Sequence, residues 1–298
     1  MFDFRLRVFD TVAKRLSFTK AANELNITQP AVTKHIQEIE RQLNTALFDR
    51  NGTKIKLTVA GETLLKYTEQ LFSIYRELEF EINYLNQEHK GLLRIGASTT
   101  IAQYLLSPIL AKFHEKFKEI KISLTINNTE VIEQLLLNKE IDLGLIEGYS
   151  KNRQFQYHKL IKDEIVLVTK ANHPLSKRNA LKIEELKTLP LILREPGSGT
   201  LETILFALKK VNLSLSDLKV EMQLGNTESI KSYLLHSSSF AFMSVHAVLQ
   251  ELRNKSLSVI DVKNLQIERY FQFIQLQGSH AALANLFLNF AVRYNKKL

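Results

Sequence analysis

The sequence predicts an α/β chain in three parts: a small helical domain, one long helix, and a larger domain of two α/β lobes. The first observation is three segments with helical spacing of apolar residues within residues 1–60, followed by a hairpin signal. The second is residues 62–90, which contain no proline or glycine. The third is the alternation of short apolar runs with helical patterns from Gly91 onwards. A chain of 298 residues has room for one small and one larger domain.

The composition of the chain excludes several classes of protein. Hydrophobic residues make up 45% of the chain and charged residues 24%, which is ordinary for a globular protein. The absence of cysteine excludes disulfides, thiol nucleophiles and cysteine-ligated zinc. The charged N-terminus has no signal-peptide core and the apolar runs are too short to cross a bilayer, so we expect a cytoplasmic protein without a membrane partner. A net charge of +9 permits a polyanionic partner but does not require one.

Two short helices are expected at the start of the chain. The first is indicated by four apolar residues near one helical face, Phe4, Val8, Val12 and Leu16. Ser17 is the expected N-cap of the second helix, because its hydroxyl can accept a backbone N–H. The small pair Ala21 and Ala22 in that helix suits a close helix crossing.

The third helix is expected to begin at a proline. Thr28 can cap it, and Pro30 then falls in the first turn, where backbone N–H groups have no internal partner. The expected buried stripe is Val32, Ile36, Ile39 and Leu43. The opposite face is polar and basic, with Gln29, Pro30, Thr33, Lys34, Gln37 and Arg41. Taken alone, this face fits a base-reading surface and the solvated side of any amphipathic helix equally well.

The turn between the second and third helices favours a helix-turn-helix, whose second helix places its N-terminal end in the major groove. Asn51-Gly52 predicts a hairpin directly afterwards, which would form a wing carrying Arg50, Lys54 and Lys56. An arginine there can enter the minor groove or bind phosphate. The candidate DNA-binding residues are Thr28, Gln29, Pro30, Ala31, Thr33, Lys34, Gln37 and Arg50.

Residues 1–65 resemble the DNA-binding domain of the LysR-type transcriptional regulators. The resemblance is carried by the run LSFTKAANELNITQPAVTKHIQEIERQLNTALFDRNGTKIKLTVAG, which follows that family's pattern almost without gaps. Departures are Thr33 in place of the commoner Ser, Ile39 in place of Leu, and Asn44 in place of a usual Gly. Asn tolerates the left-handed conformation that a helix C-cap needs, so the last change is mild. The resemblance implies a sequence-specific DNA-binding regulator of transcription.

Residues 61–90 are predicted to form one long helix with a coiled-coil seam. Leucines recur every seven residues, at Leu64, Leu71, Leu78 and Leu85, and Thr68, Tyr75 and Ile82 follow four residues later. A long helix packed on its own domain remains the alternative. The resemblance implies a linker helix through which two subunits pair, so that the dimer binds a pseudo-palindromic operator. The resemblance also implies contact with RNA polymerase, and it does not distinguish a dimer from a tetramer.

From Gly91 the pattern is βαβαβ, which predicts a parallel sheet with helices on both faces. The expected strands lie at 92–98, 121–127 and 141–148, and the expected helices at 101–117 and 129–139. A second series follows, with strands at 164–169, 189–194, 219–224 and 239–244, helices after GSGT and NTES, a strand at 268–277 and a closing helix at 281–295. Crossovers near 161–166 and 264–269 give lobe one as 91–161 plus 267–298 and lobe two as 162–266, after a DNA-binding domain at 1–60. This order resembles the LysR-type effector domain, which is similar to periplasmic binding proteins.

Two loops are the expected effector site, because ligands of open parallel sheets lie beyond the strand C-termini. Residues 96–100 carry hydroxyls at a helix start, and residues 194–200 repeat that arrangement in the second lobe. The resemblance places effector contacts at Ser98, Thr99, Thr100, Ser198, Gly199 and Thr200. Further candidates are Gln103, Arg194 and Thr227. We therefore expect a small effector with a carboxylate, sulfate or phosphate, no other cofactor and no metal.

The sequence offers little support for an enzyme. Ser198 lacks the glycine two residues earlier that a nucleophile elbow needs, and neither a phosphate loop nor a dinucleotide fingerprint occurs. The eight histidines are scattered without metal-site spacing. A DNA-binding domain fused to a small enzyme domain stays as the alternative. A solute-binding transport protein does not explain the first ninety residues.

Overall fold

The computed structural model describes residues 3–49, 55–86, 90–149, 151–278 and 281–295. Two compact units make up the chain, Met1–Glu79 and Phe80–Leu298, and each has its own hydrophobic core. Across these described ranges, no helix is both long enough and apolar enough to cross a membrane.

Three helices form the first unit, α1 (Phe4–Arg15), α2 (Phe18–Leu25) and α3 (Gln29–Leu43). Their core contains Val8, Phe9, Val12, Val32 and Ile36, which are all fully buried. The expected caps are confirmed: Ser17 accepts from the Lys20 backbone N–H at 3.3 Å, and Thr28 accepts from Ala31 at 3.3 Å. Asn44 ends α3 with φ of 49°, in the left-handed region expected of it.

Two leucines expected on buried stripes lie outside the core. Leu16 ends α1 as its left-handed C-cap with φ of 46°, so its side chain turns outwards and is 48% exposed. Leu43 occupies the last turn of α3 and is 51% exposed, because the chain reverses at Asn44 and Leu47 fills the core instead. Phe4 is also 40% exposed and packs edge-on against the His35 ring.

A short antiparallel ribbon follows α3 and has the position of the expected wing. Strands β1 (Phe48–Asp49) and β2 (Lys56–Leu57) pair in the register Phe48 to Leu57. The Glu40 carboxylate accepts a hydrogen bond from the Leu47 backbone N–H at 2.8 Å, which fixes the start of the ribbon to α3. The hairpin tip, with Arg50 and Lys54, lies outside the described residues.

The long helix is α4 (Val59–Leu85). It packs on the core of the first unit through Leu64 and Leu65. Thr68 was expected in the seam but is fully buried. The exposed apolar stripe keeps the expected positions Leu71, Leu78, Ile82 and Leu85. Tyr67 and Ile74 are exposed with them, so the stripe runs at spacings of three and four.

The described residues of the second unit form a nine-stranded mixed sheet bent into two lobes. Lobe one contains β3 (Gly91–Ser98), β4 (Ile120–Asn127) and β5 (Leu143–Ile146), which are parallel as expected. Lobe two contains β7 (Leu191–Arg194), β8 (Val220–Leu224) and β9 (Phe240–Ser244), also parallel. Strand β10 (Leu257–Ile260) was not expected.

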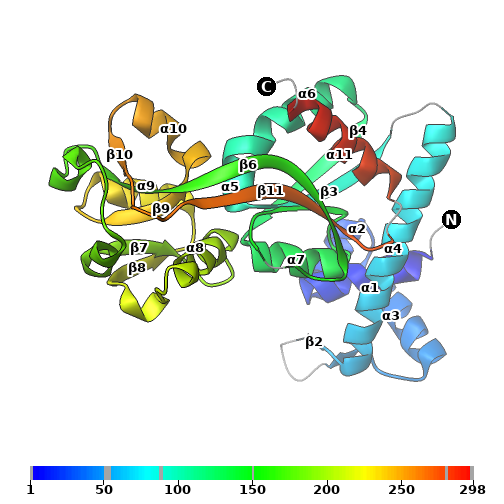
Figure 1. Ribbon diagram of the computed structural model, residues 1–298. Coiled ribbons are helices and arrows are strands. Elements are labelled where there is room, and N and C mark those ends of the chain that lie inside the picture. The colour runs from blue at the N-terminus through cyan, green and yellow to red at the C-terminus, as the bar shows by residue number, and fades with distance from the viewer. Residues whose placement is uncertain (1–2, 50–54, 87–89, 150, 279–280, 296–298) are drawn as a thin grey trace. The chain divides into compact units, whose positions relative to one another are not determined.

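Two long antiparallel strands join the lobes, β6 (Phe155–Lys170) and β11 (Ile267–Leu276). Figure 1 shows them running side by side from one lobe to the other. The sequence predicted only the second half of β6, because residues 155–163 mix polar and apolar side chains without clear alternation. These strands make the sheet mixed, so the expected parallel order holds only within each lobe.

Helices cover both faces of the sheet in each lobe. In lobe one, α6 (Ser107–Lys116) and α11 (Ala282–Asn295) pack on one face and α7 (Thr129–Leu137) on the other. In lobe two, α8 (Gly199–Lys210) packs on one face, and α9 (Thr227–Leu235) and α10 (Val245–Arg253) on the other. The short α5 (Thr99–Ile101) continues through a π-helical turn, Ala102–Leu106, into α6.

Candidate DNA-binding and effector sites

Helix α3 presents the expected polar face to solvent. Burial of Val32, Ile36 and Ile39 turns the opposite side outwards, so that Thr28, Gln29, Pro30, Lys34 and Gln37 are exposed. Ala31 and Thr33 are partly exposed. The Gln29 amide donates to the Thr33 hydroxyl at 3.0 Å, which holds the two candidate base-reading side chains together at the N-terminal end of the helix.

The wing adds one described cation beside this helix. Lys56 on β2 is exposed. Arg50, the wing residue expected either in the minor groove or at a phosphate, lies outside the described residues. The described part of the first unit therefore presents a polar helix face and a ribbon that carries Lys56 and Asp49. Glu38, which pairs with Arg41 at 2.8 Å, lies on the same helix.

The first expected effector loop ends strand β3. Ser98 and Thr100 are each 1% exposed, and Thr99 is partly buried. Ser98 caps α5 weakly, accepting from the Ile101 backbone N–H at 3.4 Å. Gln103 lies one turn later in the π-helical turn and is exposed. Such π-turns often occur at functional sites because they re-aim side chains.

The second expected loop precedes α8. Ser198, Gly199 and Thr200 are buried, and Ser198 occupies the N-cap position of α8. Arg194 is 3% exposed, but its guanidinium is paired with the neighbouring Glu195 at 2.8 Å and with the Thr227 hydroxyl at 3.4 Å. Arg194 therefore ties β7 to the start of α9, and much of its charge is neutralised locally.

A carboxylate that the sequence did not single out lies between the two loops. Glu147 follows β5 directly and is 1% exposed. The Ser98 hydroxyl donates to its Oε2, and the Thr200 hydroxyl contacts its Oε1 at 3.4 Å. One donor comes from each lobe. The structure thus brings Ser98 and Thr200 together around an acidic side chain of the protein.

Behind Glu147 lies a buried ion-pair network on the strands that join the lobes. Arg269 Nη1 donates to the Thr200 hydroxyl at 3.0 Å and lies 3.9 Å from Glu147 Oε1. Arg269 Nε donates to Asp163 at 2.7 Å, and Asp163 also accepts from Ser244 at 2.6 Å. Arg269 and Asp163 are almost completely buried, so each depends on the other for charge compensation.

Three buried polar atoms near these residues have no hydrogen-bond partner within the described part of the chain: Arg269 Nη2, Ser198 Oγ and Thr99 Oγ1. A buried donor without an acceptor costs about 1–3 kcal/mol. All three side chains belong to the two loops or to the network behind Glu147. The interlobe region therefore retains donor capacity that the protein itself does not use.

Further contacts hold the lobes together on both sides of this network. The Glu130 backbone N–H donates to Gly197 O at 3.1 Å, and the Asn128 amide donates to Pro196 O at 3.4 Å. On the other side, the Tyr104 hydroxyl donates to Glu228 of α9. Burial, followed by this carboxylate, raises the pKa of Tyr104 far above its ordinary value, so it stays protonated and donates.

Gly199 is required where the lobes touch. A Cβ built there would collide with the Glu147 carbonyl oxygen, and Thr129 Oγ1 lies close by. That hydroxyl also donates to the Glu147 carbonyl at 3.1 Å. The close approach of α8 to the end of β5 therefore needs a residue without a side chain.

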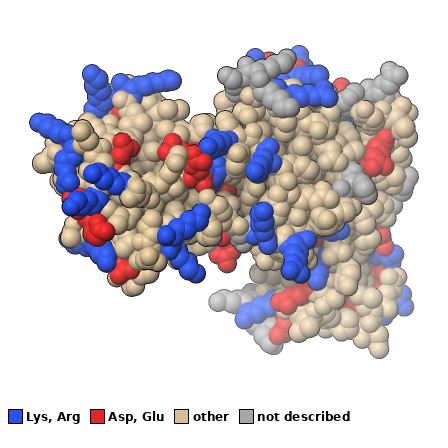
Figure 2. Space-filling view, in the orientation of Figure 1, with Lys and Arg blue, Asp and Glu red and all other residues tan. Residues whose placement is uncertain are grey.

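Acidic side chains gather at one side of this contact. Burial, followed by repulsion from the nearby Glu202 and Glu130 carboxylates, raises the pKa of Glu133 to about 7. Figure 2 shows Lys and Arg spread over the visible face of both lobes with Asp and Glu among them, so no single basic patch is evident on that face. Among the described residues, no group of three or more His, Cys, Asp or Glu side chains could hold a metal ion.

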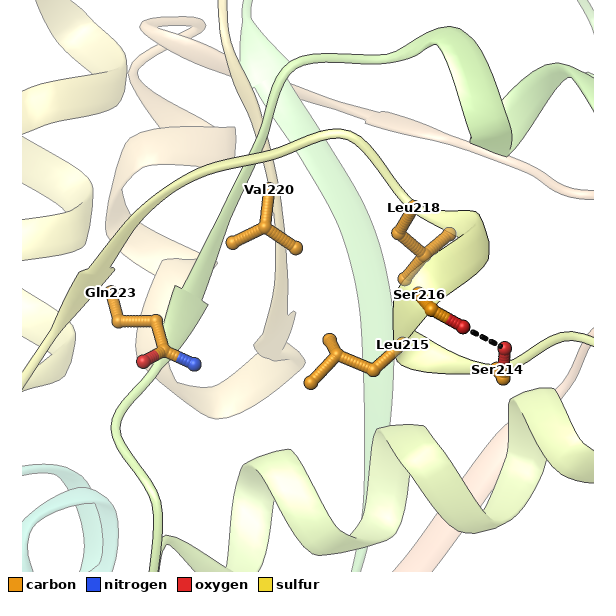
Figure 3. A pocket seen from close by; sticks show the side chains of 6 residues that line it. All are labelled: Ser214, Leu215, Ser216, Leu218, Val220 and Gln223. Carbon is orange, nitrogen blue, oxygen red and sulfur yellow. Dashed lines mark hydrogen bonds between the residues drawn. The ribbon is translucent and has the colours of Figure 1, made fainter.

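A separate hollow lies in lobe two, with a volume of about 620 Å³. Its lining comes from one stretch of chain, Ser214, Leu215, Ser216, Leu218, Val220 and Gln223 (Figure 3). Two of its hydroxyls, those of Ser214 and Ser216, are hydrogen-bonded to each other at 2.8 Å. It contains none of the expected effector residues and no charged side chain.

Two family models account for nearly the whole chain. Residues 4–62 match the bacterial regulatory helix-turn-helix protein model of the lysR family, and residues 86–296 match the LysR substrate binding domain. This chain belongs to the LysR family. It is a LysR-type transcriptional regulator with an effector-binding domain, as expected from residues 1–65 and from the order of elements after Gly91.

Comparison with individual proteins agrees with this assignment. A probable RuBisCO transcriptional regulator from Thalassiosira pseudonana is 30% identical over 94% of this chain and 93% of its own length. The structure of full-length CbnR complexed with its target DNA has a TM-score of 0.71 at 16% identity, covering 99% of this chain and 100% of its own. The Synechocystis PCC6803 CcmR regulatory domain, in complex with 2-PG, has a TM-score of 0.64 at 24% identity over 70% of this chain and 98% of its own.

Sequence reasoning about this LysR-type regulator missed Glu147, Arg269 and Asp163. Glu147 fell within the expected strand at 141–148, Arg269 within the one at 268–277, and Asp163 within the expected crossover near 161–166, and none of them was a candidate site residue. A charged residue within an otherwise apolar strand was the available signal, because such a charge is buried only with a partner. The relatives are transcriptional regulators, which are not enzymes.

Proposed function

We propose that this LysR-type regulator binds a pseudo-palindromic operator as an oligomer, and that a small anionic effector bound between the two α/β lobes alters that binding. The observation that carries the effector part is the meeting of Ser98 from lobe one and Thr200 from lobe two on one carboxylate. Donors that hold a buried carboxylate of the protein are also suited to the carboxylate, phosphate or sulfate of a ligand.

For DNA, we propose that the N-terminal half of α3 reads base edges. Gln and Thr can both donate and accept, and Lys donates to guanine or phosphate. The exposure of α3 and the Gln29–Thr33 hydrogen bond support this role. The proposed set is Thr28, Gln29, Pro30, Ala31, Thr33, Lys34, Gln37 and, on the wing, Arg50. The likeness to CbnR, which was determined with its target DNA, is consistent with it.

For the effector, we propose contacts from both loops, with Ser98, Thr99, Thr100, Gln103, Arg194, Ser198, Gly199, Thr200 and Thr227 as the candidates. The CcmR regulatory domain, similar in fold, holds the small ligand 2-PG. Unused buried donors on Thr99 and Ser198 support a ligand rich in acceptor oxygens. We propose no other cofactor, no metal and no catalytic activity.

For assembly, we propose that the apolar stripe of α4 pairs two chains. Leu71, Leu78 and Leu85 are each at least 42% exposed, at the heptad spacing of a coiled-coil seam. A dimer presents two α3 helices to successive major grooves, and a tetramer could be built from two such dimers. The proposal includes a contact with RNA polymerase and action in the cytoplasm.

The experiment is a fluorescence-anisotropy titration of operator DNA with and without small anions, on the full chain. Effector and DNA affinities must change each other by the same factor, so a genuine effector shifts the Kd for DNA. Thr200→Met should remove that shift while leaving the Kd of the unliganded protein unchanged. A footprint and Kd unaffected by every anion that binds the protein would refute the effector part.

The alternative, a DNA-binding domain joined to a small enzyme domain, is tested with the same ligands. Recovery of a bound ligand unchanged after prolonged incubation supports the sensor, and its turnover supports the enzyme.

A further inference from the structure

The residues proposed to hold an effector anion already hold one that belongs to the protein. Glu147 is 1% exposed, and its two carboxylate oxygens contact the Ser98 and Thr200 hydroxyls, one from each lobe. The Arg269 guanidinium lies 3.9 Å from the nearer oxygen. A buried carboxylate needs such partners, because burying it without them is far more costly than leaving it in water.

We propose that Glu147 is an internal competitor of the effector: its side chain occupies the anion position and holds the lobes together when no small molecule is bound. This inference rests on the proposed effector site and adds a second ligand for it. A carboxylate, phosphate or sulfate of the effector then binds by displacing the Glu147 carboxylate from Ser98 and Thr200.

The position of Glu147 in the fold supports this role. It follows β5, which pairs in parallel with β3, so Glu147 and Ser98 lie at the carboxyl ends of neighbouring strands. That edge of a parallel sheet is where α/β domains place their ligands. Thr200 then adds a donor from the opposite lobe, so the carboxylate bridges the gap a ligand would bridge.

The site also contains enough donors to bind the incoming anion and the displaced Glu147 carboxylate at the same time. Arg269 Nη2, Ser198 Oγ and Thr99 Oγ1 are buried without partners among the described residues. An incoming anion can use the two free hydroxyls, and the displaced Glu147 can move towards the nearby guanidinium. Arg269 would then share its charge between Asp163 and Glu147. A ligand without acceptor oxygens gains nothing from this set of donors.

An internal competitor lowers the apparent affinity for any anion, because only the molecules in which the position is free can bind it. The apparent affinity is the intrinsic affinity multiplied by the fraction of such molecules. Removing the Glu147 carboxylate should therefore strengthen the binding of simple anions at this place. We expect at least a tenfold lower Kd, because the change removes both the competition and a like charge next to the ligand.

The test uses sodium acetate, sulfate and phosphate as probes on the full-length protein, with calorimetric titration and thermal unfolding as readouts. Glu147→Ala leaves a space of carboxylate size, and Glu147→Gln keeps the shape while removing the charge. Glu119→Ala is the matched control, because it removes an exposed carboxylate from the same lobe. A second variant, Ser98→Ala in the Glu147→Ala background, removes one of the proposed donors.

The expected result is that acetate binds the Glu147→Ala protein at least tenfold more tightly than wild type or Glu119→Ala, and raises its melting temperature towards that of wild type. Adding Ser98→Ala should abolish this rescue. Glu147→Gln should bind sulfate or phosphate more tightly than wild type. The affinities of variant and wild type can therefore be compared even if the alanine variant does not fold.

Two results would overturn the inference. One is that wild type binds the three anions as tightly as the folded Glu147 variants. The other is that the folded variants bind none of them. Both concern direct binding, so they stand apart from the proposed function, which fails instead if bound anions leave the affinity for DNA unchanged.

Discussion

Replacing Gly199 by alanine should separate the two lobes at the point where their backbones meet. The new Cβ would collide with the Glu147 carbonyl oxygen, and the atoms around it are mainly backbone, so no side-chain rotation relieves the clash. Overpacking of this kind costs roughly 1–3 kcal/mol. We expect the effector domain to unfold several degrees lower, since about 1 kcal/mol shifts the melting temperature of a domain this large by roughly 2–4 °C.

The assay is thermal unfolding of the full chain, followed by near-ultraviolet circular dichroism, together with the anion response of DNA binding. Gly225→Ala is the matched control, because a Cβ at Gly225 meets nothing within 4 Å and its φ is not positive. We expect Gly225→Ala to behave as wild type. If Gly199→Ala unfolds at the wild-type temperature with an intact anion response, the lobes do not meet at Glu147 as described.

Three further predictions concern other parts of the chain. Gln29→Ala should weaken binding to the operator about tenfold while changing binding to unrelated DNA little, because a base contact is worth about 1–3 kcal/mol. Competition gel shifts measure the ratio of the two affinities, and equal losses on both DNAs would contradict the prediction. Glu133→Gln should remove a pH dependence of stability. The pKa of Glu133 in the folded protein is about 7, above the ordinary 4.5, so the protonated carboxyl favours the folded state. The stability of the wild-type protein should therefore fall as pH rises between these two values. Melting temperatures from pH 4 to 8 check this, and a wild-type curve that does not fall over that range would refute it. Leu78→Glu should weaken self-association at least tenfold by placing a charge in the exposed stripe of α4, as sedimentation velocity would show; an unchanged association constant would move the contact elsewhere.

Local chemistry made the first unit predictable. The caps at Ser17 and Thr28, the proline in the first turn of α3 and the left-handed Asn44 all follow from interactions within a few residues. The same holds for the order of strands and helices in the second unit, where short apolar runs are bounded by turn residues. Leu16 escaped prediction because its exposure depends on where the chain turns, and no local pattern records that.

The effector region was predictable only in part. Its hydroxyl loops could be located, because they follow strands and precede helices. The role of Glu147 depends on Ser98, which is 49 residues away, and on Thr200 from the other lobe. The ion pair of Asp163 and Arg269 joins residues 106 positions apart. Spacing along the chain carries no information about such contacts, so neither Glu147 nor the ion pair of Asp163 and Arg269 could be identified from the sequence.

The paired strands β6 and β11 determine what kind of motion the two lobes can make. The link between the lobes is a hydrogen-bonded ribbon, and its register shifts between Phe271 and Gln272, where a bulge increases the local twist. A ribbon resists bending within the plane of its hydrogen bonds but can change its twist. We therefore expect any relative movement of the lobes to be a torsion about the ribbon axis, which rotates one lobe against the other.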